Sequence, residues 1–62
     1  MTKPTCKLLG QNGNIINLIA ITSMTLKKAG EPSKALEMNK RVMVCGSYDE
    51  ALRIIGEYVE IV

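Results

Sequence analysis

Two kinds of side chain in this sequence are of types that support catalysis or metal binding: its cysteines and its acidic residues. Cys6 and Cys45 stand 39 positions apart, and the chain has no histidine to activate a thiol or complete a tetrahedral metal site. Four acidic residues lie near the C-terminus: Asp49, Glu50, Glu57 and Glu60. The first two fit the first turn of a helix, where the dipole favours negative charge, and the others fit solvated positions. The sequence therefore predicts a protein that is not an enzyme and holds no metal and no cofactor.

The glycine-rich stretch GQNGN, residues 10–14, is neither a GxGxxG motif nor a P-loop, and it lacks the lysine that would hold a phosphate. Asn12-Gly13 is typical of a β-hairpin turn, but the apolar residues that follow do not alternate as a second strand requires. On a helix they share one face: Ile15, Leu18, Ile19, Thr22, Leu26 and Ala29. We therefore predict a strand-to-helix turn over residues 10–13, with Asn14 as the N-cap and Gly30 after the helix end.

Two further helices are predicted from start and stop signals. Pro32 suits the first turn of the second helix, and Gly46 ends it. Ser47 and Glu50 then have the spacing of a capping box for the third helix. The second helix is expected to bury Ala35, Met38, Val42 and Cys45, flanked by Leu36 and Met43. The third is expected to carry inward Tyr48, Ala51, Leu52 and Ile55.

The C-terminal segment EYVEIV permits two interpretations. Gly56 is a natural helix stop and the segment alternates, which favours a strand over residues 57–61 paired with residues 5–9. Alternatively, Val59 and Val62 continue the helical face that begins at Tyr48. With the strand, the chain is a small α+β domain over residues 1–62. Its order is β-α-α-α-β, with a three-helix core and a two-stranded sheet formed by the N- and C-terminal segments.

Four segments, CKLLGQNGN, LKKAGEP, GSYDEAL and EYVEIV, together resemble a family of short bacterial proteins encoded in Bacillota genomes, prophages and mobile elements. The usual pattern of that family is a strand, a GxDGN turn, helices, SGDYD and a closing WVEV strand. Asn12, Ser47 and Tyr58 depart from it, since the family has Asp, Asp and Trp there. The resemblance implies the β-α-α-α-β fold and an intracellular setting, and it implies no biochemical activity.

Length and composition limit the setting further. Sixty-two residues make one small domain. A core of this size gives little stability, so a second subunit is expected to stabilise the fold. Two widely spaced cysteines and no convincing export signal predict a reduced, cytoplasmic protein. The apolar run over residues 15–21 is far too short to span a bilayer. We expect no membrane partner.

The charges are unevenly distributed along the chain. Residues 1–46 carry seven Lys or Arg and two Glu, whereas residues 47–62 carry one Arg and four acidic residues. A candidate nucleic-acid contact is therefore the basic group Lys27, Lys28, Lys34, Lys40 and Arg41. The third helix is acidic and would repel DNA, which argues against sequence-specific duplex recognition. Accessory or non-specific nucleic-acid binding by a phage or mobile-element protein is thus one possible function, and the alternative to the protein interaction described next.

Apolar residues outside the main helical faces predict a surface for binding another protein. The candidate protein interface consists of Ile21, Met24 and Val44. Such a surface, together with an exposed strand edge and a small core, predicts a non-enzymatic protein-interaction module that self-associates. We expect a homodimer or an unidentified protein partner.

Overall fold

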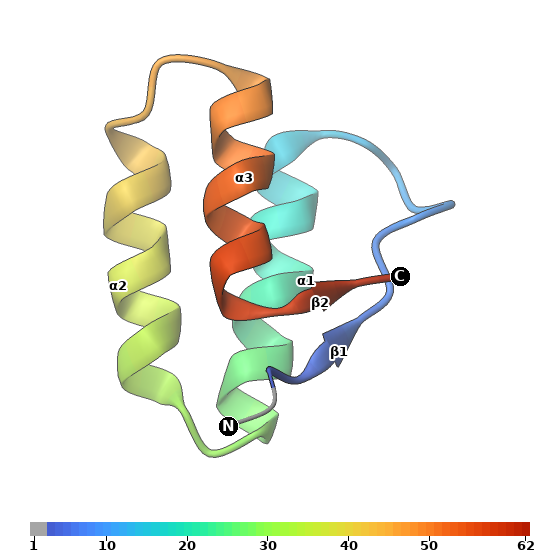
Figure 1. The fold of residues 1–62 in the computed structure, drawn as a ribbon, viewed down its shortest axis with the longest axis vertical. Coiled ribbons are helices and arrows are strands. Elements are labelled where there is room, and N and C mark those ends of the chain that lie inside the picture. The colour runs from blue at the N-terminus through green and yellow to red at the C-terminus, as the bar shows by residue number, and fades with distance from the viewer. Residues whose placement is uncertain (1–2) are drawn as a thin grey trace.

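The computed structural model describes residues 3–62 and contains five elements in the predicted order β-α-α-α-β (Figure 1). They are β1 (Thr5–Cys6), α1 (Ile15–Lys28), α2 (Pro32–Met43), α3 (Tyr48–Tyr58) and β2 (Glu60–Ile61). The α+β prediction is therefore confirmed, with three helices and one two-stranded sheet. Within residues 3–62, no helix combines the length and the apolar character needed to cross a membrane.

The turn before α1 is closed by asparagine side chains rather than by hairpin pairing. The Asn12 side-chain oxygen accepts a hydrogen bond from the Asn14 N–H (3.0 Å), and the Asn14 side chain accepts one from the Ile16 N–H (2.9 Å). The Asn17 side-chain amide donates to the Asn12 carbonyl (3.0 Å), which ties the turn to the first turn of the helix. These bonds satisfy amides that a helix start leaves without partners, so the predicted N-cap at Asn14 is confirmed.

The start of α3 confirms the predicted capping box with one shift. The Ser47 hydroxyl accepts a hydrogen bond from the Glu50 N–H (3.2 Å), as expected of an N-cap. The Glu50 carboxylate, however, accepts from the Gly46 N–H (3.3 Å), one residue before the cap. The helix start is thus fixed by side chains within four residues of one another in the sequence.

The C-terminal segment differs from the prediction of a strand over residues 57–61. Helix α3 continues through Gly56 to Tyr58, and only Glu60 and Ile61 form the strand. Pairing with β1 is parallel, with Thr5 opposite Glu60. The helix continues because this keeps the Tyr58 ring on the buried face of α3, where it is 8% exposed.

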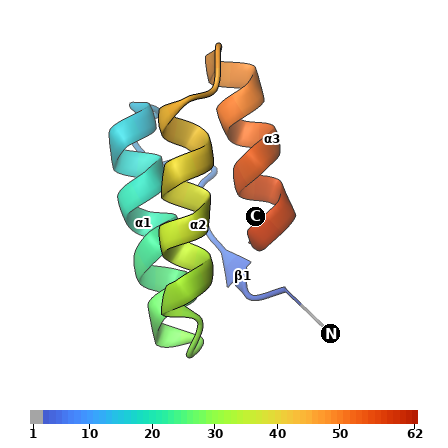
Figure 2. The same ribbon diagram turned by 90° about the vertical axis from the view of Figure 1, so that its left-hand side faces the viewer.

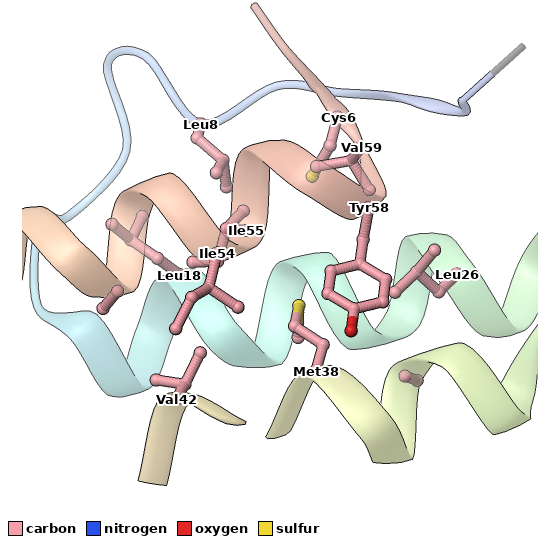
Figure 3. Close-up of a cluster of buried hydrophobic side chains, with 12 residues drawn as sticks. Cys6, Leu8, Leu18, Leu26, Met38, Val42, Ile54, Ile55, Tyr58 and Val59 are labelled. Carbon is pink, nitrogen blue, oxygen red and sulfur yellow. The ribbon is translucent and has the colours of Figure 1, made fainter. Parts of the chain in front are cut away.

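One cluster of buried side chains joins all three helices and β1 (Figure 3). Its largest fully buried members include Leu26, Met38 and Ile55. The prediction for α3 is corrected at Tyr48, which is 46% exposed, because the helix turns its buried face toward Ile54 instead. The core comprises Cys6, Leu8, Leu18, Leu26, Ala35, Met38, Val42, Ala51, Ile54, Ile55, Tyr58 and Val59.

The three helices run alternately up and down, and the strands cover only part of them. Figure 2 looks onto α2, with α1 and α3 on either side and β1 behind. Strand β1 packs against α1, and β2 follows α3 directly. The antiparallel pair α1–α2 therefore keeps one side that neither α3 nor the sheet covers.

Candidate functional site

The three residues predicted as a protein interface differ in exposure. Ile21 is half-buried and packs against the core, one helical turn before Thr25, whose hydroxyl donates to the Cys6 Sγ (3.4 Å). Ile21 is therefore only partly available on the surface. Met24, one turn after Ile21 on α1, is 57% exposed, and Val44 is 84% exposed just beyond the end of α2. Met24 and Val44 are thus the exposed members of the predicted set.

A different apolar surface is formed by the solvent side of the α1–α2 pair, which we call the hairpin face. The side-chain amide of Asn39 donates to the Ser23 hydroxyl (2.8 Å) and so ties the two helices on this side. Residues one or two turns away along each helix share that side. The hairpin face comprises Ile16 and Ala20 of α1, Leu36 and Met43 of α2, and at its edge Met24, which lies one turn after Ala20.

The large side chains of the hairpin face are exposed rather than buried. The exposed fraction is 74% for Ile16, 60% for Leu36 and 82% for Met43. Met24 is similarly exposed, at 57%. Because α1 and α2 are antiparallel, Met43 lies toward the start of α1 and Leu36 toward its end. These four large apolar side chains form the apolar centre of the hairpin face, and exposed apolar patches are candidate interaction sites.

Lysines border this patch. Lys27 is one turn beyond Ser23 on α1, Lys40 is one turn beyond Leu36 on α2, and both are exposed. The acidic residues of the chain lie elsewhere: Glu31, Glu37 and Glu57 line a cavity beside α3, Asp49 and Glu50 are in the first turn of α3, and Glu60 is in β2. Among residues 3–62, the hairpin face therefore combines an apolar centre with a positive border.

The five basic residues predicted to contact nucleic acid are divided between different surroundings. Lys27 and Lys28 are exposed in the last turn of α1. Lys34 forms an ion pair with Glu31 (3.2 Å), and Arg41 turns toward α3. Lys40 alone borders the hairpin face from α2. Two of the five are thus engaged in ion pairs, and Lys27, Lys28 and Lys40 are exposed outside these pairs.

Arg41 is the centre of a polar network that ties α2 to α3. Its guanidinium donates two hydrogen bonds to the Glu57 carboxylate (2.8 and 3.0 Å) and a third to the Tyr58 hydroxyl (3.1 Å). The same group lies 5.7 Å from the centre of the Tyr58 ring, within the range of a cation–π contact. The Tyr58 hydroxyl in turn donates to the Glu37 carboxylate.

This network shifts the titration of its members. Burial, followed by the hydrogen bond to Glu37, raises the pKa of Tyr58 above its ordinary value. Hydrogen bonding from Arg41 lowers the pKa of Glu57 and raises that of Arg41. A cavity of about 250 Å³ beside the network is lined by three cations and three carboxylates, so its charges compensate one another. We interpret the network as an internal tie between helices rather than a ligand site.

The ion pair gives the first testable prediction. Because the pKa of Glu57 is lower in the folded chain than its ordinary value of 4.5, the pair stabilises the fold above pH 4.5. This contribution is lost as the pH falls below 4.5 and Glu57 is protonated. In Glu57→Gln the midpoint of urea unfolding should fall less between pH 7 and pH 3 than in the original chain.

Glu60→Gln is the control for this experiment, because Glu60 is a carboxylate on β2 outside the ion pair. It should keep the acid sensitivity of the original chain. Equal loss of stability in Glu57→Gln and the original chain would show that the Arg41–Glu57 pair makes no pH-dependent contribution.

The two cysteines differ in burial and in location. Cys6 is 2% exposed in the core, and Cys45 is half-buried with its thiol donating to the Ser47 carbonyl (3.5 Å). Cys45 also lines an apolar hollow of about 310 Å³ between the helices, together with Ile15 and Val42. Within residues 3–62, no three His, Cys, Asp or Glu side chains are placed to hold a metal ion.

Sequence reasoning missed Ile16, Leu36 and Met43 as surface residues. It placed Leu36 and Met43 beside the buried face of α2, where a neighbouring helix covers one flank and leaves the other open. The one available signal was the four-residue spacing of Ile16, Ala20 and Met24, which sets a second apolar line along α1.

Comparisons with protein-family models, with curated proteins and with solved structures found no match for this chain.

Proposed function

We propose that this chain is a non-enzymatic protein-interaction module that self-associates through its hairpin face. The observation that carries the proposal is the exposure of Ile16, Met24, Leu36 and Met43 on one side of α1 and α2. Pairing two such sides would remove these side chains from water and surround them with helices, as in a four-helix arrangement.

The expected self-association is weak. Full burial of a large apolar side chain contributes about 1.5–3 kcal/mol, so the four partly exposed ones offer roughly 4–8 kcal/mol per copy. Association itself costs an estimated ~4–15 kcal/mol in lost freedom of motion. Two copies together offer roughly 8–16 kcal/mol, a range that overlaps the cost of association. We therefore expect a weak dimer that dissociates on dilution.

Met43→Lys tests the surface directly. Met43 is 82% exposed, so the substitution should leave the fold intact while placing one more positive charge within the paired surface. We expect the original chain to shift from monomer to dimer over a concentration series in sedimentation velocity, and Met43→Lys to remain monomeric throughout.

Leu9→Lys is the matched control, because Leu9 is 67% exposed in the loop after β1, outside the hairpin face. It should dimerise like the original chain. A Met43→Lys protein that still dimerises, or a Leu9→Lys protein that does not, would contradict the assignment of the hairpin face.

Accessory nucleic-acid binding has less support. Of the five basic residues, Lys34 is paired with Glu31 and Arg41 with Glu57. Loss of these pairs would offset part of the gain from any phosphate contact. A protein-interaction surface requires no such rearrangement at the hairpin face.

A further inference from the structure

We infer that the hairpin face recognises one amphipathic helix of a partner protein, with Asp or Glu on both sides of its apolar stripe. The inference rests on the proposed function, since it uses the same surface, and it adds the chemistry of the partner. The acidic helix would displace the second copy of the chain. The chain then self-associates when the partner is absent, and partner binding replaces the dimer by a complex of one chain with one helix.

The charge pattern of the surface favours an acidic partner. Lys27 and Lys40 border the apolar centre, and within residues 3–62 the six acidic side chains all lie on other parts of the molecule. Two copies that pair through this face bring four lysines together with no carboxylate between them, which weakens the dimer. A helix with carboxylates at its flanks replaces this repulsion by attraction.

The shape of the surface favours a helix. Ala20 lies between Ile16 and Met24 along α1, so a small side chain separates two large ones and lets a neighbouring backbone approach closely. Met24 and Met43 are flexible and adapt to different side chains of a partner. Helix α1 has 14 residues and is therefore about 21 Å long, which matches a partner helix of about four turns.

The two occupants should respond to salt in opposite directions. Added salt screens the repulsion between the lysines of two copies and so strengthens self-association. It also screens the attraction between those lysines and the carboxylates of an acidic helix, and so weakens partner binding. Opposite salt dependences would separate the two events at one surface.

The test uses the full isotopically labelled chain and two synthetic peptides of about four helical turns. Both carry leucines at the i, i+3, i+4 and i+7 positions, and their flanks carry either glutamate or lysine. Amide NMR shifts at Ala20, Met24 and Met43 report on the face, at low and at moderate salt. We expect the glutamate peptide to bind about tenfold more tightly than the lysine peptide at low salt, with a smaller ratio at higher salt.

Charge reversal gives the matching control. Lys27→Glu with Lys40→Glu changes two exposed side chains and should reverse the preference, so that the lysine peptide binds more tightly. Equal binding of both peptides by the original chain, or an unchanged preference in the double variant, would overturn the inference. Phosphatidylglycerol vesicles are titrated in parallel, and shifts at the face with vesicles but with neither peptide would also overturn it.

The outcomes separate this inference from the proposed function. If the chain self-associates through Met43 but shows no preference between the peptides, the inference fails and the proposed function stands. If neither self-association nor peptide binding affects the face, both fail.

Discussion

Replacing Met38 by alanine is expected to lower the free energy of unfolding by about 2–5 kcal/mol. Met38 is 0% exposed and points into the core between the three helices, close to Tyr58 (Figure 3). Truncation removes apolar contacts and leaves a cavity that the surrounding helices fill only in part. At about 0.05–0.15 kcal/mol per residue, the whole chain has roughly 3–9 kcal/mol of stability, so Met38→Ala should leave it close to unfolding.

The matched control is Met43→Ala, which makes the same chemical change five positions further along the chain. Met43 is 82% exposed, so at concentrations where the chain is monomeric its truncation should change stability by less than about 0.5 kcal/mol. Urea unfolding followed by circular dichroism measures both variants. Similar unfolding midpoints for Met38→Ala and Met43→Ala would show that α2 does not bury the side assigned to the core.

Tyr58→Phe is expected to lower the free energy of unfolding by about 1–2 kcal/mol while keeping the buried ring. The hydroxyl donates to Glu37 and accepts from Arg41, so its removal breaks two charge-assisted hydrogen bonds between α2 and α3. The loss stays modest because Glu37 is exposed and water can replace the hydroxyl as its partner. Tyr48→Phe is the control, since the hydroxyl of this half-exposed tyrosine donates only to the neutral Gly13 carbonyl.

High pH provides a second measurement on the same residue. The pKa of Tyr58 is raised above its ordinary value of 10.0, chiefly because the ring is buried. Below pH 10 the phenol is protonated in both the folded and the unfolded chain, so its contribution is fully present. Above pH 10 the unfolded chain releases this proton first, and stability falls as the pH rises. Tyr58→Phe should lack this alkaline component and Tyr48→Phe should retain it; the reverse pattern would contradict the burial of Tyr58.

The starts of α1 and α3 were predictable from sequence because the groups that fix them are close along the chain. The Asn14 side chain accepts from the N–H two residues later, and the Ser47 hydroxyl accepts from the Glu50 N–H within a single turn. These hydrogen bonds satisfy backbone amides locally and depend little on the remaining fold. The β-α-α-α-β order follows from such signals and from hydrophobic spacing.

The end of α3 was not predictable in the same way. Gly56 and the β-forming residues after it favour a strand locally, yet the helix extends to Tyr58. Continuation buries the Tyr58 ring against the core and brings its hydroxyl to Arg41, 17 positions earlier in the chain. The stabilisation from these contacts exceeds a propensity difference of about 1 kcal/mol, and it exists only once α2 and α3 are packed.

The candidate surface shows the same division. The sequence by itself determined that α1 and α2 carry more apolar residues than one buried stripe requires, and it named Met24 among them. Only the tertiary structure decided that Ile21 packs against the core, whereas Ile16, Leu36 and Met43 remain exposed. Helical periodicity places a residue at an angle around its own helix, but the neighbours that cover that angle come from segments distant in the sequence.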